Sequence, residues 1–269
     1  MSSIDPTAGT LPHKRAGSGP PLLLIHAIGA NRDSFDPILA PLAAEHSLVL
    51  PELPGHGSAP ALDGEVTIAR IADRLEAFID EQGLDGVDVV GSSLGARLAL
   101  ELARRKKVGT TIALDPGGFW SPRELRIFGA SVTASYKLVL GIQPLLPALT
   151  GNPVTRTTLL AQFSARPWAL PQDVVLPELR SFAASPGFGP TLDALKHGPP
   201  QAGLPAGEAR GPIHLVWGRQ DRVSFPSQAA RAQEAFPDAD LTWFDRCGHF
   251  PHWDQPEKTV EFVLERTRG

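Results

Sequence analysis

Cysteine is nearly absent from this chain of 269 residues, which contains only Cys247. A single cysteine excludes a disulfide bond within the chain. The first thirty residues also lack the basic, apolar and cleavage regions that follow one another in a secretory signal, so we expect a cytoplasmic protein. No apolar run approaches the roughly 20 residues that cross a bilayer, and we therefore expect no association with a membrane.

Motifs for metals and nucleotides are lacking as well. The sequence has no CxxC, no HExxH, and no GxGxxG after a predicted strand, so we expect neither a metal site nor a cofactor. The formal net charge is -4 at pH 7, and the one basic run, residues 104–107, stands where a predicted helix ends. Because cations are favoured at a helix C-terminus, we interpret this run as a solvated helix end. We expect a small-molecule substrate rather than nucleic acid, and a monomer or homodimer.

What the sequence does contain is an alternation of strand and helix patterns. Short, continuous apolar runs, typical of strands that are buried on both faces, occur at 20–27, 46–53, 86–91, 109–115, 212–218 and 239–245. Helical patterns lie between or after them at 67–83, 93–105, 226–236 and 255–266. A weaker alternating strand is expected around residues 11–16. This order predicts an α/β fold with a mostly parallel central sheet flanked by helices.

The alternation stops in the middle of the chain. Residues 121–207 are rich in proline and apolar residues, and they show short helical patches but no strand of similar quality. We therefore predict a core formed by 1–120 and 208–269, with 121–207 as a helical cap inserted above the carboxyl edge of the sheet. Ligands bind at this edge in open parallel sheets.

The stretch Gly91-Ser92-Ser93-Leu94-Gly95 joins a predicted strand directly to a predicted helix. A sharp strand-to-helix turn needs a strained central residue and small neighbours, which the pattern G-x-S-x-G supplies. Ser93 is the central residue, and Ser92 is a spacer. The alternative is a glycine turn in which the serines have no chemical role.

A serine nucleophile needs a base, and the base needs an orienting acid. Later strands end in loops that offer both: Asp221 after the strand at 212–218, and His249 after the strand at 239–245. His252 is the alternative base. Asp115, at the end of the strand that follows the nucleophile helix, is the alternative acid.

Two further aspartates flank the histidine loop. We interpret Asp245 as a turn residue at a strand end and Asp254 as a residue at a helix start. Neither is expected to take part in the chemistry.

Together these residues resemble the α/β-hydrolase superfamily, and specifically its capped serine hydrolases. The resemblance rests on five motifs: LLLIHAIGA, LPGHGS, VVGSSLGARLAL, VWGRQDRV and CGHFPHWDQPE. It implies an α/β-hydrolase fold with an eight-stranded, mostly parallel sheet, a mobile helical cap, and a Ser93-His249-Asp221 triad that needs no cofactor. It also makes Glu52, before the turn at 54–57, a structural residue.

A tetrahedral intermediate needs backbone donors for its oxyanion. One is the amide of Leu94 at the start of the nucleophile helix, and the resemblance implies the amide of Ile28 as the other. The family usually has glycine after the histidine of this loop, whereas this chain has Ala27. If that position has positive φ, alanine would strain it, and Gly29 would have to relieve the strain. His26 is interpreted as structural.

Serine at the elbow indicates acyl chemistry, because relatives that attack saturated carbon carry aspartate there. The first hypothesis is therefore a serine hydrolase that cleaves an ester or similar acyl bond through an acyl-enzyme, with a preference for apolar substrates suggested by the aromatic residues of 121–207. The second is a carbon-carbon bond hydrolase with the same triad, favoured if Arg97 points into the pocket; we expect Arg97 on the helix surface instead. The third is a non-catalytic ligand-binding protein on this fold.

Overall fold

A single seven-stranded sheet forms the centre of the computed structural model, which describes residues 10–267. The strands are β1 (His13–Ala16), β2 (Pro21–Ile25), β3 (Ser47–Pro51), β4 (Asp88–Ser92), β5 (Thr111–Leu114), β6 (Ile213–Gly218) and β7 (Asp240–Phe244). Their order across the sheet is β1-β3-β2-β4-β5-β6-β7. Only β1 is antiparallel to its neighbour, and the other six strands run parallel.

The mostly parallel α/β fold is therefore confirmed, with one correction to the strand count. The expected eight strands are seven within residues 10–267. The weak pattern at 11–16 does form a strand, β1, which pairs with β3 from His13 opposite Pro51 to Ala16 opposite Leu48. The central strands are continuously apolar because helices cover them on both faces. All four residues of β5, for example, are buried.

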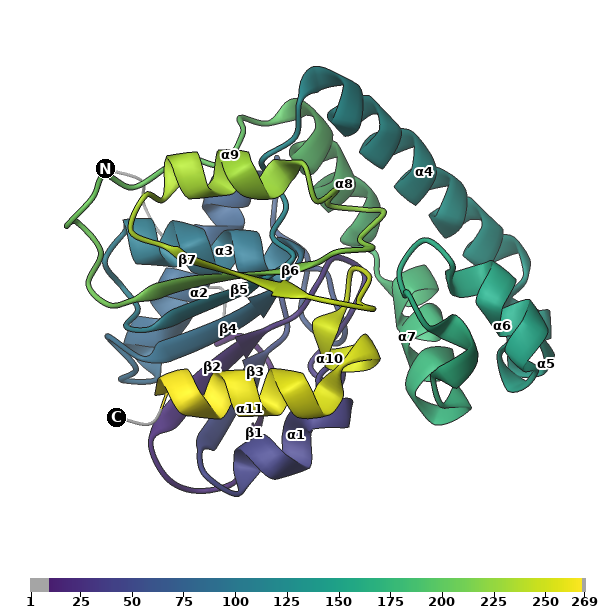
Figure 1. Ribbon diagram of the computed structural model, residues 1–269, viewed down its shortest axis with the longest axis horizontal. Coiled ribbons are helices and arrows are strands. Elements are labelled where there is room, and N and C mark those ends of the chain that lie inside the picture. The colour runs from purple at the N-terminus through teal and green to yellow at the C-terminus, as the bar shows by residue number, and fades with distance from the viewer. Residues whose placement is uncertain (1–9, 268–269) are drawn as a thin grey trace.

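Two layers of helices cover the sheet (Figure 1). Helices α1 (Asp36–Ala43) and α11 (Pro256–Thr267) contact each other on one face. Helices α2 (Ile68–Glu81), α3 (Leu94–Arg104) and α9 (Gln228–Ala235) lie on the opposite face. Apolar side chains from each layer and the facing side of the sheet form two separate cores. The carboxyl ends of the six parallel strands consequently meet at one open edge.

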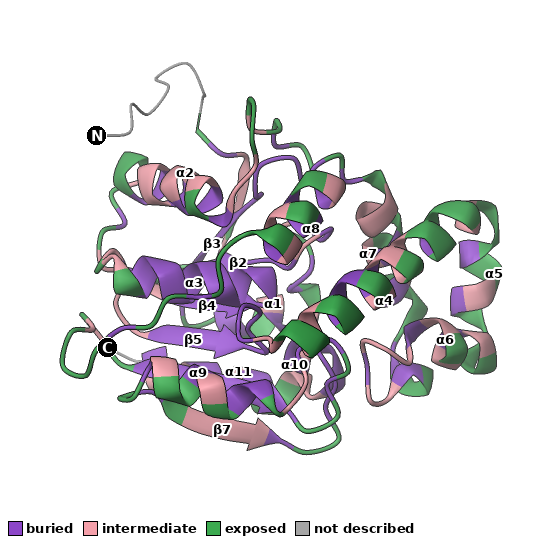
Figure 2. Ribbon diagram, turned by 90° about the horizontal axis from the view of Figure 1, so that it is seen from above, coloured by how far each residue is buried: buried purple, intermediate pink, exposed green. Residues whose placement is uncertain are grey.

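Helix α2 shows how the sequence specifies one of these layers. Thr67 caps its first turn by accepting a hydrogen bond from the backbone N–H of Arg70. Its buried residues recur at helical spacing and face the core, with Leu75 and Phe78 fully enclosed. Helix α3 differs, because all but its last residue are buried (Figure 2).

Between β5 and β6 the chain forms five α-helices, which we call the α4–α8 segment (residues 122–197). They are α4 (Pro122–Gly141), α5 (Leu146–Gly151), α6 (Pro153–Leu160), α7 (Gln172–Ala184) and α8 (Phe188–His197), with short 3-10 turns at Gln143–Leu145 and Pro167–Ala169. Ser121 and Glu124 form a capping box that starts α4. In Figure 1 the segment lies on the side to which the strand arrows point, beside the carboxyl edge of the sheet. It extends over much of the predicted 121–207 insertion.

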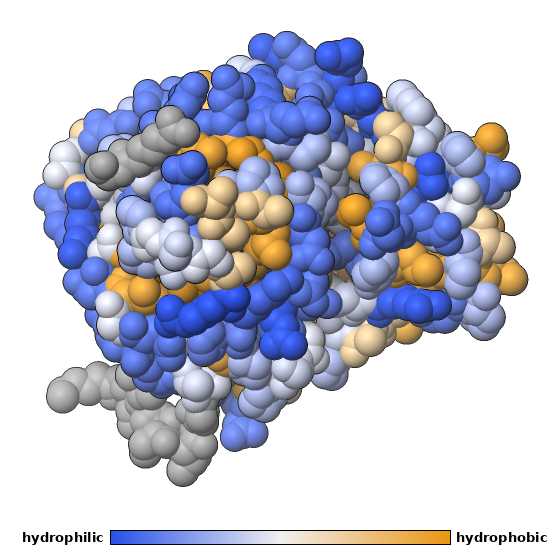
Figure 3. All heavy atoms as spheres, turned by 90° about the horizontal axis from the view of Figure 1, so that it is seen from below, coloured by the Kyte–Doolittle hydropathy of each residue, from blue (hydrophilic) through white to orange (hydrophobic). Residues whose placement is uncertain are grey.

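The α4–α8 segment also carries the large apolar side chains that are most exposed in the described chain. They are Ile127, Leu138, Leu140, Leu145, Val154 and Trp168. Figure 3 shows apolar surface at this end of the molecule, interspersed with hydrophilic atoms. Within residues 10–267 no single helix is long and apolar enough to cross a membrane. Taken together, the segments Pro122–Gly141 and Gln143–Gly151 reach the length and apolar composition of a membrane span, but the chain bends by 72° between them.

Candidate active site

Ser93 lies at the turn from β4 into α3, where the backbone has an unusual conformation. Its φ is 56° and its ψ is -110°. A non-glycine residue with positive φ costs roughly 1–3 kcal/mol and persists only where its surroundings hold it. The Ser93 N–H donates to the carbonyl of Leu114 at 2.9 Å, and the Ser93 carbonyl accepts from Arg97 as α3 begins. The side chain is thereby held at the carboxyl edge of the sheet.

Two glycines make this tight turn possible. A Cβ on Gly91 would lie 2.2 Å from the carbonyl oxygen of Gly95, and a Cβ on Gly95 would lie 2.0 Å from that of Ile25. Both distances are far below van der Waals contact. Any larger residue would therefore force α3 away from the strands, which is the physical reason for the G-x-S-x-G spacing.

Three side chains from separate loops form a hydrogen-bonded chain at this edge. The Ser93 Oγ and His249 Nε2 are 2.8 Å apart, and His249 Nδ1 and Asp221 Oδ2 are also 2.8 Å apart. With the proton on Nδ1, the imidazole donates to Asp221 and accepts from the Ser93 hydroxyl. All three side chains are buried, Ser93 being the most accessible. The arrangement can pass a proton from the hydroxyl to the imidazole while the carboxylate stabilises the resulting cation.

Backbone donors fix the orientation of the Asp221 carboxylate. Its Oδ1 accepts from the N–H groups of Val223, at 2.7 Å, and Ser224, at 3.1 Å. These bonds leave Oδ2 directed at the imidazole. The loop after β6 thus forms its own cradle for the acid.

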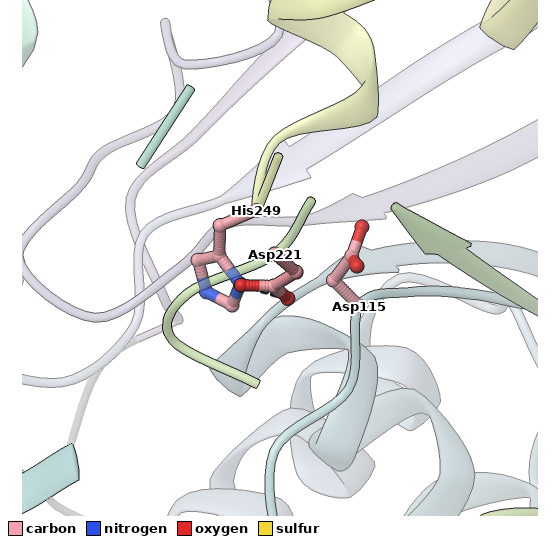
Figure 4. Close-up of side chains that lie close together, drawn as sticks. All are labelled: Asp115, Asp221 and His249. Atoms are coloured by element: carbon pink, nitrogen blue, oxygen red, sulfur yellow. Dashed lines mark hydrogen bonds and ion pairs between the residues drawn. The ribbon is translucent and has the colours of Figure 1, made fainter. Parts of the chain in front are cut away.

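Asp115, the alternative acid, lies on the far side of Asp221 from His249 (Figure 4). Its Oδ1 accepts from the Gly218 N–H at 2.8 Å, and its Oδ2 has no partner among the described residues. Burial, and then the charge of Asp221, raise the pKa of Asp115 well above its ordinary value. Asp221, and not Asp115, makes the hydrogen bond to His249.

Asp115, Asp221 and His249 are the only described side chains whose ligand atoms lie close enough together to hold a metal ion. Those of Asp115, Asp221 and His249 lie within 4.8 Å of one another. However, the nitrogen and the oxygen that would bind the ion are already joined in the 2.8 Å hydrogen bond between His249 and Asp221. The donor set is therefore better matched to proton transfer than to metal ligation.

The other candidate residues do not join the hydrogen-bonded chain. The buried Ser92 hydroxyl has no partner within the described chain. His252 packs against Phe35 with ring centres 5.0 Å apart, and burial lowers its pKa to about 3. His26 accepts from the Leu53 N–H and donates to the Ala27 carbonyl, so its role is the structural one expected.

The loop after His26 brings the Ile28 backbone to the site without strain at Ala27. The described non-glycine residues with positive φ do not include Ala27, whereas Gly29 has a φ of 76°. The concern over alanine at this position is thus removed, because the left-handed residue of the loop is Gly29. Among the hydrogen bonds of residues 10–267, none uses the backbone N–H of Ile28 or Leu94. Both predicted oxyanion donors are therefore unoccupied by protein acceptors.

A cavity opens onto Ser93 and His249 from the side of the α4–α8 segment; we call it the Ser93 cavity. Its wall is largely apolar and includes Ile28, Phe128, Val132, Leu160, Phe163 and Phe182. Polar side chains on the wall, besides Ser93 and His249, are His26, Ser34, Ser92, Glu178 and His252. None of the described lining residues is a lysine or an arginine.

Asp254 has a role that the sequence interpretation missed. Its carboxylate accepts from the Gly248 N–H at 2.7 Å, from the Ala165 N–H at 2.8 Å, and from the Ser164 hydroxyl at 2.5 Å. The His249 N–H donates in turn to the Phe163 carbonyl at 2.8 Å. Asp254 thus joins the histidine loop to the α4–α8 segment. It ends the short helix α10 (Pro251–Asp254) and does not start α11, and its position five residues after His249 was the only sequence signal.

Glu52 and Asp245 lie outside the site. Glu52 accepts from the backbone and hydroxyl of Ser58, as expected of a structural residue. Asp245, which follows β7, forms an ion pair with Arg219 at 2.7 Å.

The expectation that Arg97 lies on the helix surface is wrong. Its side chain is buried and donates to the Pro199 carbonyl at 2.6 Å. The guanidinium lies 5.9 Å from the ring centre of Trp120, and burial lowers its pKa to about 10. Arg97 is enclosed because the chain returning from α8 to β6 crosses this face of α3, and it does not line the Ser93 cavity.

Comparisons with known proteins identify the family and the fold. A family profile described as "Alpha/beta hydrolase family" matches residues 22–262. An uncharacterized protein of Mycobacterium tuberculosis is 27% identical, over 92% of this chain and 75% of its own length. A 2-hydroxy-6-oxononadienedioate/2-hydroxy-6-oxononatrienedioate hydrolase of Dechloromonas aromatica is 25% identical, over 95% of this chain and 89% of its own length. Among solved structures, a thermophilic esterase from Thermogutta terrifontis has a TM-score of 0.73 at 19% identity, covering 95% of this chain and 92% of the esterase.

Proposed function

Because this chain belongs to the alpha/beta hydrolase family and has the corresponding fold, we propose that it is a serine hydrolase that cleaves an ester or a similar acyl bond of a small, mostly apolar substrate. The observation that carries the proposal is the pair of 2.8 Å hydrogen bonds that join Ser93, His249 and Asp221. Hydrolase activity follows from the family; the serine chemistry and the ester class are the proposal.

In the proposed reaction His249 takes the hydroxyl proton as Ser93 attacks the acyl carbon. The backbone N–H groups of Ile28 and Leu94 stabilise the oxyanion, and Leu94 adds the positive end of the α3 dipole. His249 then protonates the leaving group, and a water molecule, activated by the same imidazole, releases the acid from Ser93. This sequence requires no metal and no cofactor.

A carbon-carbon bond hydrolase is the second candidate, since relatives such as the Dechloromonas aromatica protein are named for that activity. The substrate in the name of the Dechloromonas aromatica relative is a dicarboxylate. The Ser93 cavity presents no lysine or arginine among its described lining residues, and Arg97 is turned away from it. A doubly anionic substrate would therefore lose its hydration without gaining a cationic partner, which places the ester hydrolase first.

A fluorophosphonate probe tests the serine chemistry directly. We expect the native protein and Ser92→Ala to be labelled and Ser93→Ala not to be. Ser92 is the matched control, because its hydroxyl is adjacent, buried and without a partner in the described chain. No labelling of folded native protein would refute the proposal and favour a non-catalytic binding protein.

A substrate panel then separates the two candidates. p-Nitrophenyl esters of increasing chain length should be hydrolysed, with Ser93→Ala inactive on all of them. A vinylogous diketone of the type cleaved by carbon-carbon hydrolases serves as the comparison. Turnover confined to the diketone would reverse the order of the two candidates.

A further inference from the structure

Among the described residues that line the Ser93 cavity, Glu178 is the one acidic side chain. It lies on α7, half-buried, and lines the Ser93 cavity. The other lining residues of α7, Leu179 and Phe182, are apolar. A single carboxyl group therefore interrupts the apolar side of the cavity that α7 forms.

The groups that face Glu178 leave its charge uncompensated. The Ser34 hydroxyl, which also lines the cavity, favours the charged form of Glu178 and holds its pKa down. Asp33 and Asp36 lie farther away and are both bound by Lys14, at 2.9 and 3.0 Å. The nearby His252 on the cavity wall is neutral at ordinary pH, because burial lowers its pKa to about 3. Among residues 10–267, no salt bridge to Glu178 is formed.

Such a carboxyl group is costly to the fold. Burial, followed by the charges of Asp36 and Asp33, raises the pKa of Glu178 to about 7, although Ser34 favours the charged form. Acidic side chains are rarely enclosed without a partner, and those in a cleft with a perturbed pKa are candidates for ligand contact.

A purely structural role for Glu178 is already served by other residues. The hydroxyls of Ser181 on α7 and of Ser185, which follows the end of α7, donate to the Gly29 carbonyl at 3.1 and 3.2 Å. The Asn31 amide donates to the Ser181 hydroxyl at 3.2 Å. These bonds join α7 to the loop that carries Ile28. A neutral glutamine at 178 would retain the contact to Ser34 without the cost of a buried charge.

We propose that Glu178 selects ligands of the Ser93 cavity by charge. It binds an ammonium or, more weakly, a hydroxyl group carried by an otherwise apolar substrate, and it excludes substrates with a carboxylate at that position. The proposal rests on the assignment of the Ser93 cavity as the substrate site of the proposed hydrolase. It narrows the substrate class to acyl compounds with a hydrogen-bond donor, best a cationic amine, on the part of the molecule that contacts α7.

Binding of three ligands of similar size tests the proposal: 4-phenylbutylamine, 4-phenylbutanol and 4-phenylbutanoate, measured by calorimetry. At about pH 8.5, where Glu178 is ionised, the amine should bind to native protein at least about tenfold more tightly than the carboxylate. Glu178→Gln should reduce this ratio by about 10- to 100-fold, mainly by weakening the amine and strengthening the carboxylate. At about pH 5.5 the native ratio should approach that of the variant, because Glu178 is then protonated.

Asp173→Asn is the matched control, since Asp173 is exposed in the first turn of the same helix and does not line the cavity. It should leave the amine-to-carboxylate ratio unchanged. An equal ratio in native protein and Glu178→Gln would overturn the proposal, and so would failure of all three ligands to bind. Because binding is measured instead of turnover, a protein that resists fluorophosphonate labelling would refute the serine chemistry and still give a clear answer on Glu178.

Discussion

Glu178 should make the stability of this protein fall as pH rises, and its replacement by glutamine should remove that dependence. Enclosure in the cavity wall raises the pKa of Glu178 from its ordinary 4.5 to about 7. Between these two values the folded chain binds more protons than the unfolded chain. The free energy of unfolding must then decrease with increasing pH across this window.

The magnitude follows from the pKa difference. Each pKa unit corresponds to about 1.4 kcal/mol, so a fully enclosed group would cost the folded state about 3 kcal/mol above pH 7. Glu178 is half-buried and keeps contact with the cavity, and solvent screening reduces this figure to about 1–3 kcal/mol. Glu178→Gln should therefore match native protein near pH 4 and exceed its stability by that amount near pH 8.

Urea denaturation at a series of pH values measures the difference directly. In thermal unfolding the same change would raise the melting temperature by several degrees, since 1 kcal/mol is worth roughly 2–4 °C in a chain of this size class. Asp173→Asn, on the exposed side of α7, is again the control and should not reproduce the pattern. A difference between native protein and Glu178→Gln that is the same at every pH would refute the reasoning, because a loss or gain of packing does not titrate.

Four further substitutions probe the site and its supporting contacts. Asp221→Asn should lower kcat on a p-nitrophenyl ester by about 10⁴-fold, by disturbing the imidazole tautomer. Asp115→Asn should lower it less than tenfold, because Asp115 makes no hydrogen bond to His249 and an asparagine oxygen can still accept from the Gly218 N–H; the opposite ranking would make Asp115 the acid. Asp254→Ala leaves three donors without their acceptor and should cost about 3 kcal/mol or more in urea denaturation; a loss under 1 kcal/mol would contradict its bridging role. Gly95→Ala places a Cβ 2.0 Å from the Ile25 carbonyl and should prevent native folding; a soluble variant with native circular dichroism would refute this.

The core of the fold and the hydrogen-bonded arrangement of Ser93, His249 and Asp221 could be predicted because their signals are local. A strand buried on both faces must be continuously apolar, and a turn as tight as that at Ser93 needs glycine on both sides. The order of the loops then places Asp221 and His249 beside the serine once the strands are parallel. Each step uses a few neighbouring residues and one rule of sheet topology.

Arg97 and Asp254 could not be placed in this way because their partners are distant in the sequence. Arg97 reaches the carbonyl of Pro199, 102 residues later. Its helix is covered by the sheet, by α2 and by the returning chain, although Arg97, Glu101 and Arg104 form a polar stripe that in the sequence resembles a solvent-exposed face. Asp254 binds Ser164 and Ala165, 90 and 89 residues earlier. Only the packing of the α4–α8 segment creates either contact.

The contacts of Asp254 couple the position of the base to the α4–α8 segment. His249 is held through its own N–H by the Phe163 carbonyl, and Gly248 through its N–H by Asp254, which also holds Ser164. A Cβ on Gly248 would lie 2.8 Å from the Phe163 oxygen, so the two loops are in direct contact. Any motion that opens the Ser93 cavity and preserves the hydrogen bond between His249 and Ser93 must therefore leave residues 163–165 in place. Within residues 10–267, α7 is hydrogen-bonded to the Ile28 loop only through side-chain hydroxyls and an amide, which exchange more easily for water, but its buried face packs in one apolar cluster with Leu160 and Trp253.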